Sequence, residues 1–418
     1  MELKPGYKQT EVGVLPADWE VRPLGGYVHL RTGPFGSALH KSDYTHNDVP
    51  VINPMHIVGG SLTPTENMTV TESAARALAD FRVRENDILI GRRGDMGRCA
   101  VVKSSQAGWL CGTGSMIVRC GEGVDPSFLQ RVLSSPRAIA AIDSASVGST
   151  MINLNQSTLS KLLIQIPPLR EQRTIAAALS DVDALIGSLD ELSAKKRDLK
   201  QAAMQTLLTD QTRLPGFNGK WETRRVDEMG EVLAGKALDI YGPGRLRPYL
   251  RTKNVLDGYI DLEDLLEMPM TDAEFERFRI VSSDVLLNEG QSLELVGRCS
   301  MYRDELASPC AMQNQLLRFR ARAHTSPAFA EHLFRYCQHT GVFSAIATQT
   351  TSVAHLGSSR FSSLRLKWPS DFAEQSAIAT VLSNMDAELA ALEQRREKTA
   401  LLKQGMMQEL LTGRTRLV

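Results

Sequence analysis

The sequence repeats itself over a long period, and this feature constrains the fold more than any local pattern. Residues 171–214 match residues 374–417 at a displacement of 203 positions (374 − 171 = 203). Aligned without a gap, about half of the paired positions are identical. The rest of each half repeats more loosely, with Trp19 matching Trp221. The repeat predicts a cyclic, pseudo-twofold molecule in which a variable domain precedes each matched tail.

The two matched tails are predicted to be long helices. Residues 170–208 contain no proline and a single glycine, Gly187, and their apolar residues recur at steps of three, four and seven. A helix of about 38 residues is about 57 Å long at about 1.5 Å per residue. We expect the helices to run antiparallel as a coiled-coil spacer; the alternative is an ordinary core helix packed on each domain. The apolar positions expected at the helix–helix and partner interfaces are Ile175, Leu179, Val182, Ile186, Leu189 and Leu199, and then Ile378, Leu382, Met385, Leu389, Leu392 and Leu402.

The rest of the chain is predicted to form mixed α/β (α+β) globular domains. At roughly 100–200 residues per domain, a chain of 418 residues holds two or three. We divide it into a first variable domain, a first spacer helix, a second variable domain and a second spacer helix, at residues 1–166, 167–212, 213–369 and 370–418. Strands are predicted within residues 49–52, 87–90, 99–102, 115–119, 284–287 and 315–319, and shorter helices within residues 72–81, 126–134, 273–278 and 327–336. The order of the strands does not follow from the sequence.

Charge and cysteine usage exclude several classes of protein. Lys plus Arg and Asp plus Glu each total 48, so the net charge is zero and contact with a polyanion must rest on local charge. The six cysteines show no C-x-x-C spacing, which argues against a zinc ribbon or a disulfide framework. No apolar run approaches the roughly 18 residues of a membrane span, and the N-terminus lacks the pattern of a secretion signal. We therefore expect a cytoplasmic protein with reduced thiols.

A glycine-rich basic loop, residues 91–98, lies between two predicted strands and is the first candidate for contact with DNA. Its side chains Arg92, Arg93 and Arg98 suit phosphates or guanine edges, and the alternative is a solvated hairpin. The matching loop of the second half, residues 288–294, is acidic and contains Gln291. If these loops read DNA, the two halves should read different bases.

Further candidates for DNA binding are weaker, because each also fits an ordinary surface. A Gly/Pro-rich stretch of the second half carries four cations that suit backbone phosphates, or that form a scattered surface charge. Segments of small residues let a backbone approach a phosphate closely, or form simple turns. These candidates are Arg245, Arg247, Arg251 and Lys253 in the basic stretch, and Arg31, Ser37, Ser149, Thr150, Gln349 and Thr350 in or beside the small-residue segments.

The sequence lacks the motifs of several kinds of catalysis. An amino-methyltransferase motif, Asn or Asp before Pro-Pro and an aromatic residue, is matched only in part by residues 53–55, Asn-Pro-Met. There is no G-x-x-x-x-G-K-[ST] phosphate loop and no H-E-x-x-H helix. A nuclease centre built from scattered carboxylates and lysines stays open. We expect a chain that is not an enzyme and that binds no metal and no cofactor of its own.

Three segments resemble the specificity (S) subunits of Type I restriction-modification systems. Residues 6–16, followed by Trp19, resemble the opening of many such subunits. Residues 166–172, Ile-Pro-Pro-Leu-Arg-Glu-Gln, are similar to the entry to their conserved spacer, and residues 411–417 resemble their ending. Together with the duplication, the resemblance covers essentially the whole chain. The second spacer entry, residues 368–375, departs from the pattern because it lacks the second proline.

The resemblance implies two target-recognition domains, each reading one half of a split sequence in double-stranded DNA, separated by the antiparallel helices. It also implies that the helices hold two modification subunits, which carry S-adenosylmethionine and methylate adenine, and that two restriction subunits add cleavage with ATP and Mg. The chain itself would bind no cofactor. Three alternatives stay open: the specificity subunit of a fused restriction-modification enzyme that cuts on both sides of its site, a coiled-coil scaffold whose end domains bind proteins, and a self-sufficient methyltransferase with a cofactor site.

Overall fold

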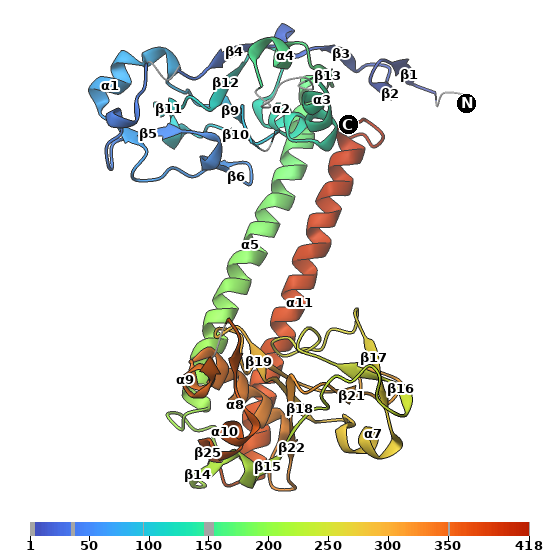
Figure 1. The fold of residues 1–418 in the computed structure, drawn as a ribbon. Helices are drawn as coiled ribbons and strands as arrows, with labels where there is room; N and C mark the ends of the chain where they lie inside the picture. Colours follow the sequence, from blue (N-terminus) through green and yellow to red (C-terminus); the bar gives the residue numbers. More distant parts are fainter. Residues whose placement is uncertain (1–4, 35–37, 95, 146–153, 350–351, 418) are drawn as a thin grey trace. The chain divides into compact units, whose positions relative to one another are not determined.

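The computed structural model describes residues 5–34, 38–94, 96–145, 154–349 and 352–417. The chain divides into two compact units (Figure 1). Unit 1 comprises Met1–Leu189 and Arg395–Val418, and unit 2 comprises Asp190–Gln394. Each unit therefore contains one globular domain together with part of each long helix.

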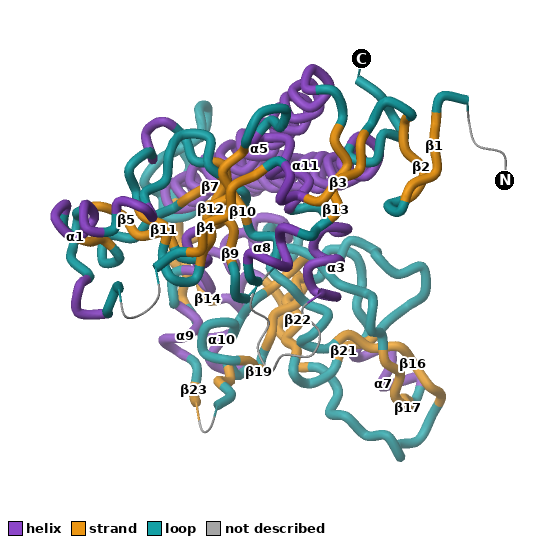
Figure 2. The backbone as a smooth tube through the Cα atoms, turned by 90° about the horizontal axis from the view of Figure 1, so that it is seen from above, coloured by secondary structure: helices purple, strands orange, loops and turns teal. Residues whose placement is uncertain are grey.

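The main sheet of unit 1 has four antiparallel strands in the order β10-β9-β12-β4, which run beside one another in Figure 2. Their bounds are β4 (Val28–Thr32), β9 (Ile88–Gly91), β10 (Cys99–Val101) and β12 (Ser115–Cys120). A second sheet has the order β11-β5-β8, with β11 parallel to β5 and β8 antiparallel to it. Its strands are β5 (Val49–Ile52), β8 (Thr69–Val70) and β11 (Leu110–Cys111).

Within the described residues of unit 1, three strand pairs and four short α-helices accompany these sheets, together with several 3-10 turns. The pairs are β1 (Tyr7–Thr10) with β2 (Gly13–Pro16), β3 (Glu20–Pro23) with β13 (Leu163–Ile166), and β6 (Ile57–Val58) with β7 (Ser61–Leu62). The helices are α1 (Glu72–Ala77), α2 (Pro126–Leu133), α3 (Pro136–Ala145) and α4 (Gln156–Ser160). Helix α2 begins where proline at the first helical position and a capping carboxylate, Asp125, favour a start.

Unit 2 repeats the two larger sheets of unit 1 and the pair β3 with β13. Its main sheet has the order β20-β18-β22-β15, and its second sheet the order β21-β16-β17, again with one parallel pair, β16 with β21. The strands are β15 (Gly230–Ala234), β16 (Arg245–Leu250), β17 (Leu266–Met270), β18 (Val285–Asn288), β20 (Cys299–Met301), β21 (Ala311–Met312) and β22 (Leu316–Ala321), with β14 (Trp221–Arg225) paired to β25 (Arg365–Pro369). The helices are α6 (Val226–Met229), α7 (Asp272–Phe278), α8 (Pro327–His339), α9 (Val342–Ile346) and α10 (Ser358–Ser363). A small sheet, β19 (Gly290–Gln291), β24 (Ala354–His355) and β23 (Thr348–Gln349), is added.

The secondary structure confirms the mixed α/β fold class predicted from the sequence. Each of the six predicted strands and four predicted short helices is present within a few residues of its expected bounds. The first helix is shorter than predicted. It ends at Ala77 and is followed by a separate 3-10 turn at Ala79–Phe81.

The two long helices are α5 (Leu169–Leu207) and α11 (Phe372–Leu410), each of 39 residues. The core of unit 2 contains Leu207 from the end of α5 and Ile378 from the first turns of α11. The core of unit 1 contains Ile175 from the start of α5 and Leu410 from the end of α11. Because the start of one helix meets the end of the other in both cores, the helices run antiparallel, as predicted.

A buried polar cluster closes the start of α5 in unit 1. The Glu171 carboxylate, 2% exposed, accepts hydrogen bonds from Trp19 Nε1 (3.0 Å) and from Arg416 (2.6 and 2.8 Å). The neighbouring Gln172 accepts a bond from the Asp125 amide (2.8 Å) and donates to the Pro167 carbonyl (2.9 Å). Residues near the two ends of the sequence thus hold the first turn of this helix.

The same cluster recurs at the start of α11 in unit 2. Glu374, fully buried, accepts from Arg213 (2.6 and 2.7 Å) and from Trp221 Nε1 (3.3 Å). Gln375 accepts from the Ser326 amide (2.8 Å) and donates to the carbonyl oxygen of Pro369 (2.9 Å). The C-terminal segment therefore holds the start of α5 in unit 1, as residues 208–214 hold the start of α11 in unit 2. This is the cyclic arrangement that the repeat predicted.

Candidate nucleic-acid interface

The basic loop of unit 1 connects β9 to β10, and its arginines have different environments. Arg92 is half-buried, and its Nε donates to the carbonyl oxygen of Leu154 (2.8 Å). Burial, and then the charge of Arg93, hold the pKa of Arg92 below its ordinary value. Arg93 and Arg98 are exposed, and within the described residues Arg93 has no carboxylate in ion-pair distance. Arg92 thus stabilises the loop through its backbone, and the Arg93 side chain is exposed to solvent.

The equivalent loop of unit 2 has the same backbone connections and different side chains. The Leu154 amide donates to the carbonyl oxygen of Arg92 (2.9 Å), and the Leu356 amide donates to that of Glu289 (2.8 Å). The Glu289 carboxylate in turn bonds to His355 Nδ1 (3.0 Å). Equivalent positions of one fold therefore present a cation in unit 1 and a carboxylate in unit 2.

Arg31 is positioned by β4 at the edge of the main sheet of unit 1. Its guanidinium pairs with the exposed carboxylate of Asp80 (2.5 Å) and lies over the ring of Phe81, 5.1 Å from the ring centre. The side chain is 46% exposed, so it remains accessible from solvent. An incoming phosphate would have to compete with Asp80 for this arginine.

The basic stretch of unit 2 forms two clusters, each with two cations and one carboxylate. Arg245 and Arg247 both pair with Asp272 (2.9 and 2.8 Å). The arginines hold the pKa of the Asp272 carboxyl below its ordinary value. Arg247 also lies over the ring of Phe275, 4.4 Å from its centre. This cluster has a net charge of +1, because it contains two positive charges and one negative charge.

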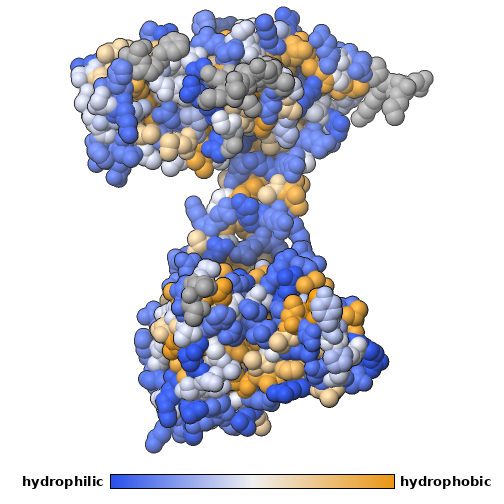
Figure 3. Space-filling model, in the orientation of Figure 1, coloured by the Kyte–Doolittle hydropathy of each residue, from blue (hydrophilic) through white to orange (hydrophobic). Residues whose placement is uncertain are grey.

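The second of these clusters lies in the segment after β16. Arg251 and Lys253 both pair with Asp264 (2.5 and 2.6 Å), and this pairing lowers the pKa of that carboxyl. The nearby surface over β16 and β17 also carries apolar side chains (Figure 3), including Leu246, which is 62% exposed. The region is therefore a mixed apolar and basic surface rather than a purely basic one.

The structure brings Gln291 and Gln349 into one small sheet, although 58 positions separate them (349 − 291 = 58). Both pair with Ala354 of the middle strand β24, one on each side. Because directly paired residues of antiparallel strands point to the same face, the two glutamine side chains leave the sheet on one side. Four further candidates, Ser37, Ser149, Thr150 and Thr350, lie outside the described residues.

The predicted interface residues of the long helices divide into three environments. Ile175, Leu179, Ile378 and Leu382 are buried in the cores of the globular domains, so there each helix packs on the domain of its own unit. Leu189 and Leu389 are buried in the middle part of their helices. Four more are partly buried: Val182, Ile186, Met385 and Leu392. The remaining two, Leu199 and Leu402, are 49% and 59% exposed, as are the neighbouring Leu192 (42%) and Leu401 (61%).

Sequence reasoning missed two ion-pair clusters where the long helices meet the globular domains. Their central residues are Asp183 of α5 and Asp386 of α11. The signal was present in the repeat, because Asp183-Ala184 recurs as Asp386-Ala387. A repeated charged residue within an apolar stripe indicates a partner that is repeated as well.

Neither a metal-binding cluster nor a membrane-crossing helix is found in the part of the chain that the structure describes. No three His, Cys, Asp or Glu side chains there are grouped so that they could hold a metal ion. No helix there combines the length and the apolar character needed to cross a membrane.

Comparisons with known proteins agree with this architecture. Residues 16–195 match the family model described as the Type I restriction modification DNA specificity domain. The EcoKI specificity subunit of Escherichia coli K12 is 23% identical over 344 residues, 77% of this chain and 72% of that subunit. The MjaIX specificity subunit of Methanocaldococcus jannaschii is 22% identical over 310 residues, 69% of this chain and 70% of that subunit.

Solved structures show the same fold. The S subunit of a Type I restriction-modification system from M. genitalium has a TM-score of 0.59 at 14% identity, over 98% of both chains. A chain in a structure of the type I R-M system has a TM-score of 0.59 at 15% identity, over 96% of this chain and 99% of that one.

The fold consists of two copies of one mixed α/β domain, each packed on two antiparallel helices. This fold defines a class of duplicated two-domain proteins. The comparisons support a Type I restriction-modification specificity subunit. The resemblance predicted from the sequence motifs is therefore confirmed, and residues 16–195 match the DNA specificity domain of those subunits.

Proposed function

We propose that this chain is the non-catalytic DNA specificity subunit of a Type I restriction-modification complex, in which each domain reads one half of a bipartite double-stranded target. The observation that carries the proposal is the pairing of one repeated fold with unlike loops. Both units build the loop after their central strand with the same backbone bonds, yet unit 1 carries the half-buried Arg92 and the exposed Arg93, and unit 2 carries Glu289, whose side chain is 16% exposed. Two copies of a scaffold with different side chains suit two different half-sequences.

The distribution of charge supports a subunit that shares its DNA with partners. The chain has no net charge, and its basic stretch in unit 2 keeps only one net charge in each cluster. Because phosphate contacts supply most of the affinity of DNA-binding proteins, such a chain alone should bind DNA weakly. Modification subunits would add the missing contacts, while exposed side chains such as Arg93 and Gln349 contribute selectivity.

We propose that the exposed leucines of the long helices contact partner subunits. Leu192 and Leu199 of α5, and Leu401 and Leu402 of α11, are each more than 40% exposed. Exposed apolar side chains at helical spacing are typical of surfaces that bind other helices. In the complex we expect two modification subunits, which carry S-adenosylmethionine, and two restriction subunits, which use ATP and Mg.

The proposal is tested by exchanging one domain in cells that contain the complete system. Residues 1–166 are replaced by those of a related chain, and N6-methyladenine is mapped across the genome by single-molecule sequencing. We expect a split target in which one half changes while the other half and the gap persist. The matched control exchanges residues 213–369 and should change the other half. A target that keeps both halves after either exchange contradicts the proposal and favours a protein-binding scaffold.

A further inference from the structure

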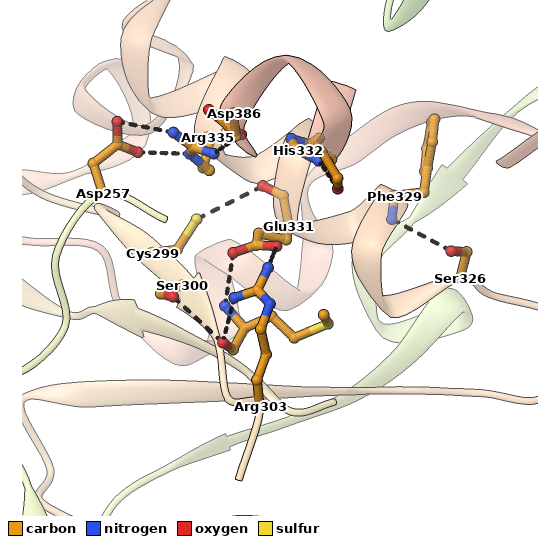
Figure 4. A network of polar contacts seen from close by, with 12 residues as sticks. Asp257, Cys299, Ser300, Arg303, Ser326, Phe329, Glu331, His332, Arg335 and Asp386 are labelled. Atoms are coloured by element: carbon orange, nitrogen blue, oxygen red, sulfur yellow. Dashed lines mark hydrogen bonds and ion pairs between the residues drawn. The ribbon is translucent and has the colours of Figure 1, made fainter. Parts of the chain in front are cut away.

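Each unit contains a repeated ion-pair cluster, here called a helix clasp, that joins the two long helices to the globular domain. The clasp of unit 2 consists of Asp386 of α11, Lys200 of α5 and Arg335 of α8. The Asp386 carboxylate accepts a hydrogen bond from Lys200 Nζ through one oxygen. Its other oxygen accepts from Arg335 Nη1 (2.8 Å), and Figure 4 shows Arg335 between Asp386 and Asp257. One carboxylate of α11 thus links its own helix to two others, α5 and α8.

The clasp of unit 1 has the same plan. Asp183 of α5 pairs with Lys403 of α11 (2.6 Å) and with Arg131 of α2 (2.5 Å). The central aspartates and the lysines are each related by the displacement of the repeat (386 − 183 = 203 and 403 − 200 = 203). Helices α2 and α8, which supply the arginines, occupy equivalent places after the last strand of each main sheet. Duplication has therefore kept a three-helix contact as well as a sequence.

The arginine of unit 2 extends the clasp to a loop of the globular domain. Arg335, whose side chain is only 8% exposed, also binds both carboxylate oxygens of Asp257 (2.7 and 3.2 Å), in the loop between β16 and β17. Burial disfavours the charge of Asp386, but the charges and hydrogen bonds of Arg335 and Lys200 together outweigh this effect, so the pKa of Asp386 lies below its ordinary value. Asp386 is thus charged at neutral pH, and a continuous chain of ion pairs runs from the helix pair to the domain.

The clasp lies at the far end of the apolar contact between α11 and its domain, where the partly buried Met385 also packs against the core. The domain of unit 2 already packs on the first turns of α11 through Ile378 and Leu382. Asp386 lies eight residues beyond Ile378, which is about 12 Å along a helix. Contacts at Ile378 and Asp386, about 12 Å apart, fix the angle between α11 and the domain, whereas one contact alone would leave this angle free. A shift of about 1 Å at the clasp would tilt the domain by about 5° about Ile378, and would move any atom about 12 Å from this pivot by about 1 Å.

We infer that Asp183 and Asp386 are positioning residues, each of which sets the angle of its own domain on the helix pair and thereby the fit of that domain's loops to its half of the target. The inference rests on the proposed function. Hydrogen bonds to base edges weaken steeply over a few tenths of an ångström, so a displacement of about 1 Å removes selectivity. Because the clasps are separate, each should control one half of the target.

Other ion pairs between the long helices provide the matched control. Lys196 with Glu388 and Arg197 with Glu393, each at 2.6 Å, connect α5 to α11 within unit 2, and each of these side chains is at least 36% exposed. Glu388 is two residues from Asp386 on the same helix, but its partner is on α5 rather than on the globular domain. A change at Glu388 therefore tests pairing of the helices without the attachment of the domain.

The variants Asp386→Asn, Asp183→Asn and Glu388→Gln are introduced into the full chain within the complete system, and methylation is measured at target sites and at sites with one mismatch in either half. We expect Asp386→Asn to reduce discrimination about tenfold in the half read by residues 213–369, which is the scale of one lost base contact, and to spare the other half. Asp183→Asn should do the reverse, and Glu388→Gln should change neither.

A fourth variant, Asp386→Glu, controls for loss of discrimination caused by misfolding. It keeps the charge, lengthens the side chain by one methylene, and should shift discrimination in the same half. The clasp of unit 2 also borders a cavity of about 1140 Å³, and water in this space can hydrate Arg335 when Asp386 is neutralised. Equal loss of discrimination in both halves, or none in any variant, overturns the inference. If the wild-type system yields no split target at all, the proposed function fails instead.

Discussion

Replacing Glu374 by glutamine should destabilise unit 2 far more than removing an exposed charge nearby. The Glu374 carboxylate is fully buried and holds Arg213 through two short bonds and Trp221 through a third. Glutamine keeps the shape but loses the charge and one acceptor oxygen. Among the residues that the structure describes, Arg213 would then keep Asp210, at 3.5 Å, as its charged partner.

The expected cost is about 2–3 kcal/mol, between that of a charge-assisted hydrogen bond and that of a broken buried ion pair. We place it below the upper end because the Arg213 side chain is 28% exposed and can be rehydrated. For a unit of about 200 residues this corresponds to a decrease in Tm of about 5–10 °C. The equivalent change in unit 1, Glu171→Gln, should cost less, because Arg416 keeps a bidentate pair with Asp18 (2.9 and 2.8 Å).

Differential scanning calorimetry of the full chain provides the measurement, with Glu388→Gln as the control. The pair of Glu388 with Lys196 is exposed, and such pairs contribute about 0–1 kcal/mol. The predicted order of destabilisation is therefore Glu374→Gln, then Glu171→Gln, then Glu388→Gln. Equal effects of Glu374→Gln and Glu388→Gln would refute the reasoning, because burial would then not decide the cost.

Three further predictions concern pH, backbone conformation and thiol reactivity. Burial lowers the pKa of His332 from 6.5 to about 3, so below pH 6.5 the unfolded chain binds a proton that the folded chain excludes. The free energy of unfolding, measured with denaturant, should therefore decrease by up to about 2 kcal/mol from pH 6.5 to pH 5. The variant His332→Gln should lose this pH dependence. Gly297→Ala should destabilise unit 2 by about 2–4 kcal/mol, because its φ is +79° and an added Cβ would lie 2.2 Å from Phe343, whereas Gly187→Ala in the open middle of α5 should stabilise by about 0.5–1 kcal/mol in thermal melts. Burial raises the pKa of Cys99, Cys310 and Cys337 to about 12, so these thiols should react with a thiol reagent at pH 8 only after denaturation; rapid labelling of the native chain would contradict their burial.

The sequence predicted the long helices and the individual strands well because both depend on local patterns. Helix α5 spans Leu169–Leu207 and lies inside the spacer predicted at 167–212, with its start limited by the prolines and its extent close to the proline-free stretch 170–208. The order of the strands was not predictable. In the main sheet of unit 1, β12 pairs Val118 with Leu30 on one side and with Ile88 on the other. Such pairs join residues up to 88 positions apart (118 − 30 = 88), so no local sequence pattern indicates which strands pair.

The candidate interface was less predictable, because charge in sequence differs from charge in space. The cations Arg245 and Arg247 were recognised, but nothing in the sequence showed that Asp272 would lie beside them. The pairing of Arg245 with Met270 in strands β16 and β17 brings Asp272 close to both arginines. The register of these two strands therefore halves the net positive charge of Arg245 and Arg247. In the same way, strand pairing brought Gln291 and Gln349 together around Ala354.

The residues repeated most faithfully are those that hold the structure, and those that we propose to read DNA are the ones that differ. Glu171 and Glu374 each close the first turn of a long helix with a tryptophan and an arginine, so both halves need the same side chains. A reading loop has the opposite requirement, because two identical loops would select two identical half-sequences. Arg92 and Glu289 occupy equivalent backbone positions and carry opposite charges. Differences between the halves, once aligned on their common framework, therefore locate selectivity better than the repeated motifs that identify the family.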